Sequence, residues 1–204
     1  MIEASQALSR LREGNRRFVA GQPTTPPLSS FERRALAADQ APFAIILGCS
    51  DSRVPAELVF DQGFGDLFVI RVAGNIVAPS QVGSVEFAAA KFGTKLVVVL
   101  GHSQCGAITT AVEELLDGAT TDSRNLQSIV NRVRPSVEAV VAGRNDVDRK
   151  TLIRESVIAN VKASVNHLRH GSELLEKLIQ NDGLLIVGAK YSLDTGVVTF
   201  FDGM

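Results

Sequence analysis

The segment FAIILGCSDSRVP, residues 43–55, decides the fold class of this chain of 204 residues. It begins as a short apolar run and stops at a glycine, after which the residues become polar. The segment KLVVVLGHSQCG, residues 95–106, follows the same plan. Continuous runs of branched side chains are typical of strands that are buried on both faces, as in a parallel sheet covered by helices on each side.

Two further runs have the same character, LFVIRV at residues 67–72 and GLLIVGA at residues 183–189. The stretches between the four runs have helical periodicity, with glycine or proline at their ends. Strands that alternate with helices along a chain indicate an α/β fold. We therefore predict a mostly parallel central sheet flanked by helices, with helices over residues 1–20, 79–93, 104–118 and, in several pieces, 122–181.

The second half of the chain carries three local signals. Pro135 lies inside a helical pattern and is expected to break or kink the helix, because proline lacks the N–H that a helix interior uses. Ser172 is expected to cap the start of the last helix. A turn at residues 194–196 is followed by an apolar stretch, which predicts an antiparallel edge strand over residues 197–201.

The N-terminal region reads as a helix followed by the proline-rich segment QPTTPPLSS, residues 22–30. Each proline there removes a backbone donor and restricts the residue before it, so we expect an extended arm. Residues 1–35 therefore form an N-terminal helix and arm, which either cover their own domain or pack on a partner subunit. We expect the whole chain, residues 1–204, to form a single domain.

Composition excludes several classes of function. The net charge is −1, and the chain has ten Phe, one Tyr and no Trp, so we expect neither a basic surface nor stacking platforms for nucleic acid. No apolar run reaches the length of a membrane span. The N-terminus lacks the apolar core and cleavage site of a signal peptide. We therefore expect a cytoplasmic protein with no membrane association, in which cysteines stay reduced.

The two cysteines of the chain follow two of the predicted strands. Cys49 comes directly after the first run, and His102 and Cys105 come after the third. Sites in open α/β sheets form beyond the carboxyl ends of the strands, so these side chains converge if the two strands are neighbours. Two thiolates and an imidazole make a zinc site with one open position, and this ligand set favours zinc over magnesium or calcium.

Asp51 and Arg53 stand beside this predicted metal site. Asp51 lies two residues after Cys49, so its carboxylate can act as a fourth ligand in a closed state. The guanidinium of Arg53 suits a bidentate pairing with that carboxylate, which would hold Asp51 away from the metal. Arg71 lies inside an otherwise apolar run, which predicts a structural ion pair if the side chain is buried.

The motif CSDSRVP at residues 49–55, followed by GHSQCG at residues 101–106, resembles the β-class carbonic anhydrases. The intervening stretches FGDLFVIRVAGN (64–75) and GSVEFAA (83–89) also resemble that family. The resemblance implies a zinc lyase that hydrates CO₂ reversibly to bicarbonate and a proton, through hydroxide bound to the zinc ion. It also implies a pocket at a dimer interface. The short apolar edges of the sheet and the proline-rich arm likewise suggest a homodimer, and they leave open a tetramer made of two dimers.

The resemblance assigns roles residue by residue. It implies zinc ligands at Cys49, His102 and Cys105, a catalytic pair at Asp51 and Arg53, and substrate-binding positions at Gln40, Phe68, Ala73, Phe87 and Gly106. Many members have tyrosine where this chain has Phe87, so a hydroxyl contact is absent from that position. Gln40 and Phe68 would face the zinc ion of the partner subunit.

Two other functions remain open on the sequence. The first is a related zinc enzyme on the same scaffold that acts on carbonyl sulfide or carbon disulfide. The second is a non-catalytic protein with a closed structural zinc site of two cysteines, one histidine and one aspartate. A CO₂ hydration assay distinguishes both from a carbonic anhydrase.

Overall fold

The computed structural model describes residues 2–26, 28–118, 123–144 and 146–203. Its core is a five-stranded sheet in the order β2-β1-β3-β4-β5. The first four strands pair in parallel, and β5 pairs antiparallel with β4. The predicted fold class is confirmed, with strands at β1 (Ala44–Gly48), β2 (Leu67–Arg71), β3 (Leu96–His102), β4 (Leu185–Tyr191) and β5 (Val198–Asp202).

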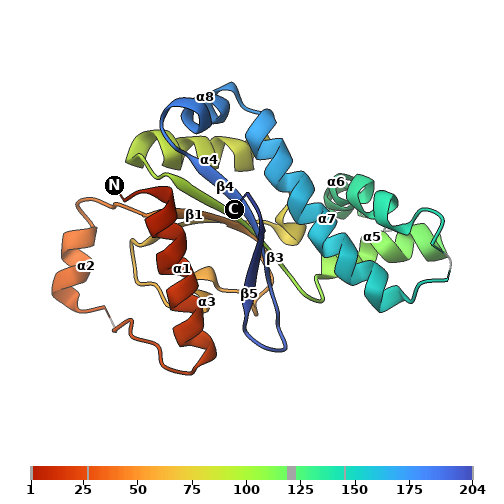
Figure 1. Cartoon of the computed structure of the whole chain (residues 1–204), viewed down its shortest axis with the longest axis horizontal. Helices are drawn as coiled ribbons and strands as arrows, with labels where there is room; N and C mark the ends of the chain where they lie inside the picture. Colours follow the sequence, from red (N-terminus) through yellow and green to blue (C-terminus); the bar gives the residue numbers. More distant parts are fainter. Residues whose placement is uncertain (1, 27, 119–122, 145, 204) are drawn as a thin grey trace.

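Helices cover both faces of the sheet (Figure 1). Helices α1 (Ala4–Val19) and α3 (Ala56–Val59) contribute to the apolar core on one face. Helices α4 (Pro79–Phe92), α7 (Arg149–His170) and α8 (Glu173–Asn181) cover the other. Successive residues of a strand point to opposite faces, so both faces of β1 are fully buried. This double burial explains the continuous apolar runs.

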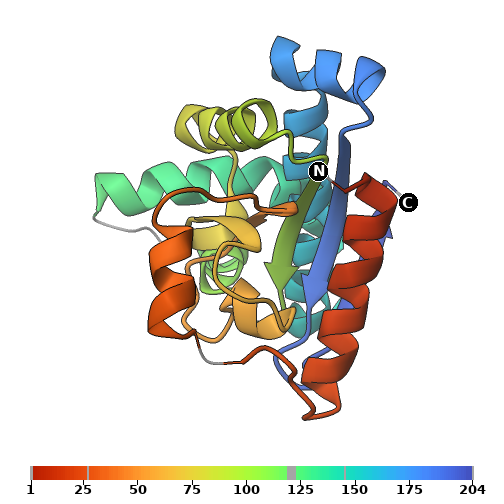
Figure 2. The same cartoon turned by 90° about the vertical axis from the view of Figure 1, so that its left-hand side faces the viewer.

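Helices α5 (Gly106–Asp117) and α6 (Arg124–Val141) pack together beyond the carboxyl ends of the strands, at one end of the molecule in Figure 1. They form a third apolar cluster that includes both cysteines. Figure 2 shows the green strand β3 and the blue strand β4 side by side, ending at this edge. A short 3₁₀ turn, η1 (Ala73–Asn75), also lies there. The carboxyl edge of the sheet is therefore enclosed by helices.

Several predicted helix boundaries are confirmed. Helix α4 begins at Pro79 and ends before Gly93, which has the left-handed φ of +64° that glycine accommodates. The hydroxyl of Ser172 accepts the backbone N–H of Leu175 at 3.1 Å and so caps α8. Within the described residues, no helix is long and apolar enough to cross a membrane.

We predicted a break or a kink at Pro135; the break is wrong, because α6 runs through this residue as one helix, and the kink stays a prediction. Pro135 is exposed, so water can reach the carbonyl that loses its intrahelical partner. The valines on the inner face are fully buried and hold the helix against the core on both sides of the proline; they are Val130, Val133 and Val137.

The proline-rich arm is followed, from Ser30, by a helix that no pattern in the sequence predicted. Helix α2 (Ser30–Leu36) stands at the rim of the molecule, away from the sheet (Figure 1). The arm is anchored on its own subunit, because the carboxylate of Asp61 accepts the backbone N–H groups of Thr24 and Thr25. Arg17 on α1 pairs with the same carboxylate.

Candidate metal centre

Three candidate ligands meet at the carboxyl edge of the sheet. Cys49 follows β1, His102 ends β3, and Cys105 directly precedes α5. Strands β1 and β3 are neighbours, as the convergence of these side chains requires. The three ligand atoms all lie within 4.8 Å of one another, and the two Sγ atoms are 4.0 Å apart. A tetrahedral zinc ion with Zn–S bonds of about 2.3 Å would place them about 3.8 Å apart, so the cluster fits zinc.

The imidazole of His102 is prepared for metal binding. Its Nδ1 lies 2.9 Å from the carbonyl oxygen of Ser103, which fixes the proton on Nδ1 and leaves the lone pair on Nε2. His102 is fully buried, and Nε2 has no hydrogen-bond partner among the described residues. Leaving a buried polar atom unpaired is costly, and a metal ion at this position would satisfy it.

The two thiols are buried and interact with each other. A hydrogen bond from the Cys105 thiol is the main reason that the pKa of Cys49 is lowered, and the pKa of Cys105 is raised by the same bond. The backbone N–H of Gly74 also donates to Cys49 Sγ, at 3.4 Å. The pair is therefore arranged so that Cys49 loses its proton first, as a thiolate ligand must.

Asp51 and Arg53 form the pair that the sequence predicts. Arg53 Nε and Nη2 donate to the two carboxylate oxygens at 2.9 Å and 2.7 Å, and the Arg53 backbone N–H donates to one of them at 2.9 Å. These bonds hold the pKa of Asp51 well below its usual range. The carboxylate oxygen Oδ2 lies 3.9 Å from Nε2 of His102. Asp51 therefore borders the ligand set while both its oxygens are bound by Arg53.

Arg71 holds the loop that carries Cys49 and Asp51. Its Nε donates to the carbonyl of Cys49 at 3.0 Å, and its Nη2 donates to the carbonyl of Asp51 at 2.6 Å. The predicted ion pair is wrong, because Arg71 is exposed and its partners are backbone carbonyls. An arginine at the end of an apolar strand predicts that its side chain has a polar partner. Only the folded structure shows that the partners are the carbonyls of Cys49 and Asp51.

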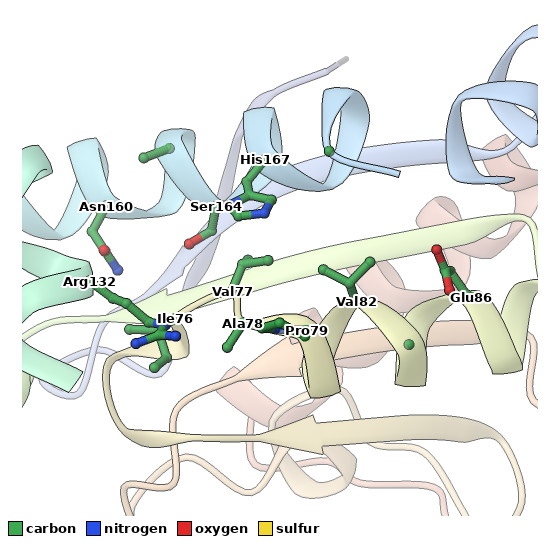
Figure 3. Close-up of a pocket in the computed structure, with 13 residues that line it drawn as sticks. Ile76, Val77, Ala78, Pro79, Val82, Glu86, Arg132, Asn160, Ser164 and His167 are labelled. Carbon is green, nitrogen blue, oxygen red and sulfur yellow. The ribbon is translucent and has the colours of Figure 1, made fainter. Parts of the chain in front are cut away.

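Two buried side chains on α7 support the turn η1, a role that no pattern in the sequence predicts. Asn160 Nδ2 donates to the carbonyl of Gly74 at 2.8 Å, and Ser164 Oγ donates to the carbonyl of Asn75 at 3.2 Å. Figure 3 shows Asn160 and Ser164 directed from α7 towards the segment that begins at Ile76. Because Gly74 donates to Cys49, these contacts connect α7 to the metal centre.

The predicted substrate-binding residues fall into two groups. Ala73 and Gly106 adjoin the metal centre, since Ala73 precedes Gly74 and Gly106 follows Cys105. Gln40 and Phe87 line a groove elsewhere on the surface, and the ring centroid of Phe68 lies 6.1 Å from that of Phe87.

The second group lies far from the metal ligands of its own subunit. Phe68 is paired with Ile45, four residues before Cys49. That offset corresponds to about 13 Å along the strand. Gln40, Phe68 and Phe87 therefore do not reach the metal centre of their own chain.

Fold and site together define a zinc-binding α/β protein whose metal centre lies at the carboxyl edge of a parallel sheet. Residues 44–198 match the family model described as carbonic anhydrase. The chain belongs to the carbonic anhydrase family, in its β class, and the cluster of Cys49, His102 and Cys105 is the typical zinc site of that class.

Relatives and solved structures agree with this assignment. The chain is 42% identical over 190 residues to carbonic anhydrase 2 of Mycobacterium tuberculosis, covering 93% of this chain and 89% of the relative. It is 38% identical to a carbonic anhydrase of Mycolicibacterium smegmatis, covering 94% and 90%. A tetrameric β-carbonic anhydrase from Sordaria macrospora shares the fold, with a TM-score of 0.76, 23% identity, and coverage of 97% of this chain and 95% of that chain.

Proposed function

We propose that this chain catalyses the reversible hydration of CO₂ to bicarbonate and a proton. The observation that carries the proposal is the buried cluster of Cys49, His102 and Cys105, beside a carboxylate that is held by an arginine. Family membership supports the same reaction. A zinc ion held by these ligands supplies Lewis acidity, which makes water a nucleophile near neutral pH.

Asp51 would orient the attacking water. Its lowered pKa keeps it ionised at neutral pH, so it can accept a hydrogen bond but cannot donate one. Arg53 fixes the direction of the carboxylate through two side-chain hydrogen bonds. The same bonds oppose coordination of the metal by Asp51, and this supports an open fourth position over the closed structural site.

The apolar wall of the substrate pocket would come from a second copy of the chain. Gln40, Phe68 and Phe87 are too far from their own metal ligands to act there, as the strand register indicates. Strand β2 is an edge strand, and large apolar side chains are exposed around it. The most exposed of these are Leu58, Phe64 and Phe87, and Phe31 on helix α2 is exposed as well.

This arrangement supports a homodimer in which each subunit completes the pocket of the other. Pairing of two dimers into a tetramer would follow the Sordaria macrospora enzymes, which are tetrameric. Residues 1–35 would contribute to the contact through the exposed helix α2. A cytoplasmic location is also part of the proposal, since it keeps Cys49 and Cys105 as the free thiols seen in the structure.

Stopped-flow measurement of CO₂ hydration tests the proposal directly. Protein loaded with one zinc ion per chain is expected to accelerate hydration, and a Cys105→Ser variant is expected to lose both zinc and rate. Zinc content is measured on the same samples by plasma mass spectrometry. Fully loaded protein without any rate above buffer between about pH 7 and pH 9 would refute the proposed reaction.

A further inference from the structure

A second cavity of about 480 Å³ lies beside the metal centre, on the β4 side of strand β3. The metal ligands lie between β1 and β3, so the two sites are on opposite sides of β3. No metal ligand lines the cavity. Its lining residues come from the loop after β3, from α5, α7 and β4: Ser103, Gln104, Thr109, Lys150, Ile153, Arg154, Val157 and Lys190.

The cavity is positively charged. Lys150, Arg154 and Lys190 line it, and no carboxylate is among its lining residues. None of the three cations forms an ion pair with the part of the chain that the structure describes. Two acidic residues near Arg154 in the sequence have other partners: Asp148 accepts the Thr151 N–H at 3.1 Å, and Glu155 pairs with Arg144.

The rest of the lining combines an apolar floor with hydrogen-bond donors. Ile153 and Val157 contribute apolar surface, and Val157 belongs to the core around the cysteines. The hydroxyl of Ser103 accepts the Leu193 N–H at 2.9 Å, so its own proton remains available. Thr109 adds a second hydroxyl. Cations and hydroxyls above an apolar floor suit a ligand with an anionic group and an apolar body.

We propose that this cavity binds a small organic anion, with a phosphate or carboxylate group at Lys150, Arg154 and Lys190 and an apolar body over Ile153. The cavity shown in Figure 3 is not expected to select anions, because the carboxylate of Glu86 lines it together with Arg132 and His167. The proposal does not depend on the reaction at the metal centre, since binding is measured without turnover.

The proposed site adjoins the catalytic loop. Gln104 lines the cavity, and its backbone has a φ of +57°, which is uncommon for a residue with a side chain. Its carbonyl oxygen lies 3.5 Å from Nη2 of Arg53, the partner of Asp51. A ligand that contacts Gln104 therefore touches the residue that precedes the metal ligand Cys105 and whose carbonyl lies beside Arg53.

The test follows the methyl resonances of Ile153 and Val157 in labelled, zinc-loaded protein during titration. The probes are phenyl phosphate, benzoate, inorganic phosphate and phenol. Phenyl phosphate or benzoate is expected to shift these resonances to saturation, and phenol is not. Comparing the two organic anions distinguishes a phosphate site from a carboxylate site. Inorganic phosphate is expected to bind more weakly, because it lacks the apolar body.

Charge reversal locates the binding. Arg154→Glu is expected to weaken the organic anion about tenfold or more, whereas Arg132→Glu, on the surface of α6, is expected to leave its affinity unchanged. The proposal is overturned if neither organic anion shifts the resonances, if phenol shifts them equally, or if Arg154→Glu binds as tightly as the parent protein. Inorganic phosphate that binds as tightly as phenyl phosphate would also overturn it.

Discussion

The carboxylate of Asp51 accepts hydrogen bonds from both the side chain and the backbone N–H of Arg53. It does so while its Oδ2 atom lies 3.9 Å from the imidazole Nε2 that faces the metal position. We propose that a small movement would bring this carboxylate onto the metal, and that the hydrogen bonds from Arg53 oppose that movement. At the scale of single residues, we propose that this pair controls the fourth coordination position.

Replacing Arg53 with alanine is therefore expected to let Asp51 coordinate the zinc ion. Because Asp51 would then occupy the position of the attacking water, kcat/KM for CO₂ should fall roughly tenfold to a hundredfold. X-ray absorption at the zinc edge should show an added carboxylate ligand. Arg16→Ala, at an exposed pair on α1, is the matched control. A spectrum that still shows a bound water molecule in the Arg53 variant would contradict the switch.

The side chain of Asp61 is another residue whose ionisation is set by its neighbours. Its burial raises the pKa, but hydrogen bonds from Arg17, Thr24 and Thr25 outweigh this effect and hold the pKa below its usual range. A lowered pKa stabilises the folded protein above the unfolded-state pKa of about 3.9, and this contribution is lost as the pH falls towards the folded-state pKa.

Asp61→Asn is accordingly expected to reduce the free energy of unfolding by about 2–4 kcal/mol at neutral pH. The difference in the free energy of unfolding between the variant and the parent protein should shrink below about pH 4. Protonation of Asp61 at low pH removes the stabilisation from its ion pair and hydrogen bonds in the parent protein. Urea unfolding at several pH values measures this. Asp66→Asn, which removes a more exposed pair with Arg10, should cost less than about 1 kcal/mol. Equal losses for the two variants would contradict the assignment.

Helix α7 and the turn η1 show how one element positions another. Asn160 and Ser164 hold two consecutive carbonyls of the turn, and the turn donates one N–H to the sulfur of Cys49. Gly74 has a φ of +70°, and a Cβ atom there would lie 3.0 Å from that of Ala107. A side chain at Gly74 would therefore strain the backbone and crowd Ala107, and contacts from α7 hold the turn against the metal centre.

Asn160→Leu is expected to weaken zinc binding about tenfold to a hundredfold, the usual effect of losing a group that orients a metal ligand. Competition with a chromophoric chelator measures the affinity, and the absorption spectrum of the cobalt-substituted protein reports the change in ligand geometry. Ser156→Ala is the matched control, because Ser156 lies one turn earlier on α7, is fully buried and has no partner for its hydroxyl among the described residues. Equal zinc affinity in both variants would refute the role.

At the scale of the whole molecule, we propose that a single chain carries only part of the substrate pocket. Its metal centre adjoins Ala73 and Gly106, whereas Gln40 and Phe87 line a groove beside the edge strand β2. Phe64 lies in the same groove and is 73% exposed, which is unusual for a phenylalanine on a monomeric surface. A second copy of the chain would bury these side chains and bring the two halves of the pocket together.

Phe64→Glu is expected to separate the dimer into monomers that keep zinc but lose most CO₂ hydration activity. Sedimentation velocity gives the oligomeric state, and stopped-flow kinetics on the same samples give the rate. Leu126→Glu, at an exposed leucine on α6, should change neither. A monomeric variant with full activity would show that the partner contributes nothing to the pocket.

The folded chain also explains why parts of the site were predictable. Cys49, His102 and Cys105 follow directly from strand ends, and parallel strands bring such ends to one edge. Asp51 and Arg53 are two residues apart, so their pairing depends only on local geometry. The continuity of α6 through Pro135 was not predictable, because it depends on the packing of buried valines against the core. Helix α2 was not predictable either, because its exposed side chains leave no apolar periodicity in the sequence.

Apolar periodicity and local spacing were therefore enough to identify the α/β fold, the metal ligands and the acid–arginine pair of this chain. The support of Cys49 by α7 needed the tertiary structure, because Asn160 and Gly74 are 86 residues apart and meet only after the sheet has formed. The same holds for the cavity between Gln104, Arg154 and Lys190, whose walls come from separate elements. Apolar periodicity in a sequence indicates which residues are buried, and local spacing indicates which residues are close along the chain. Contacts between side chains that are distant in the sequence are decided by how the elements pack.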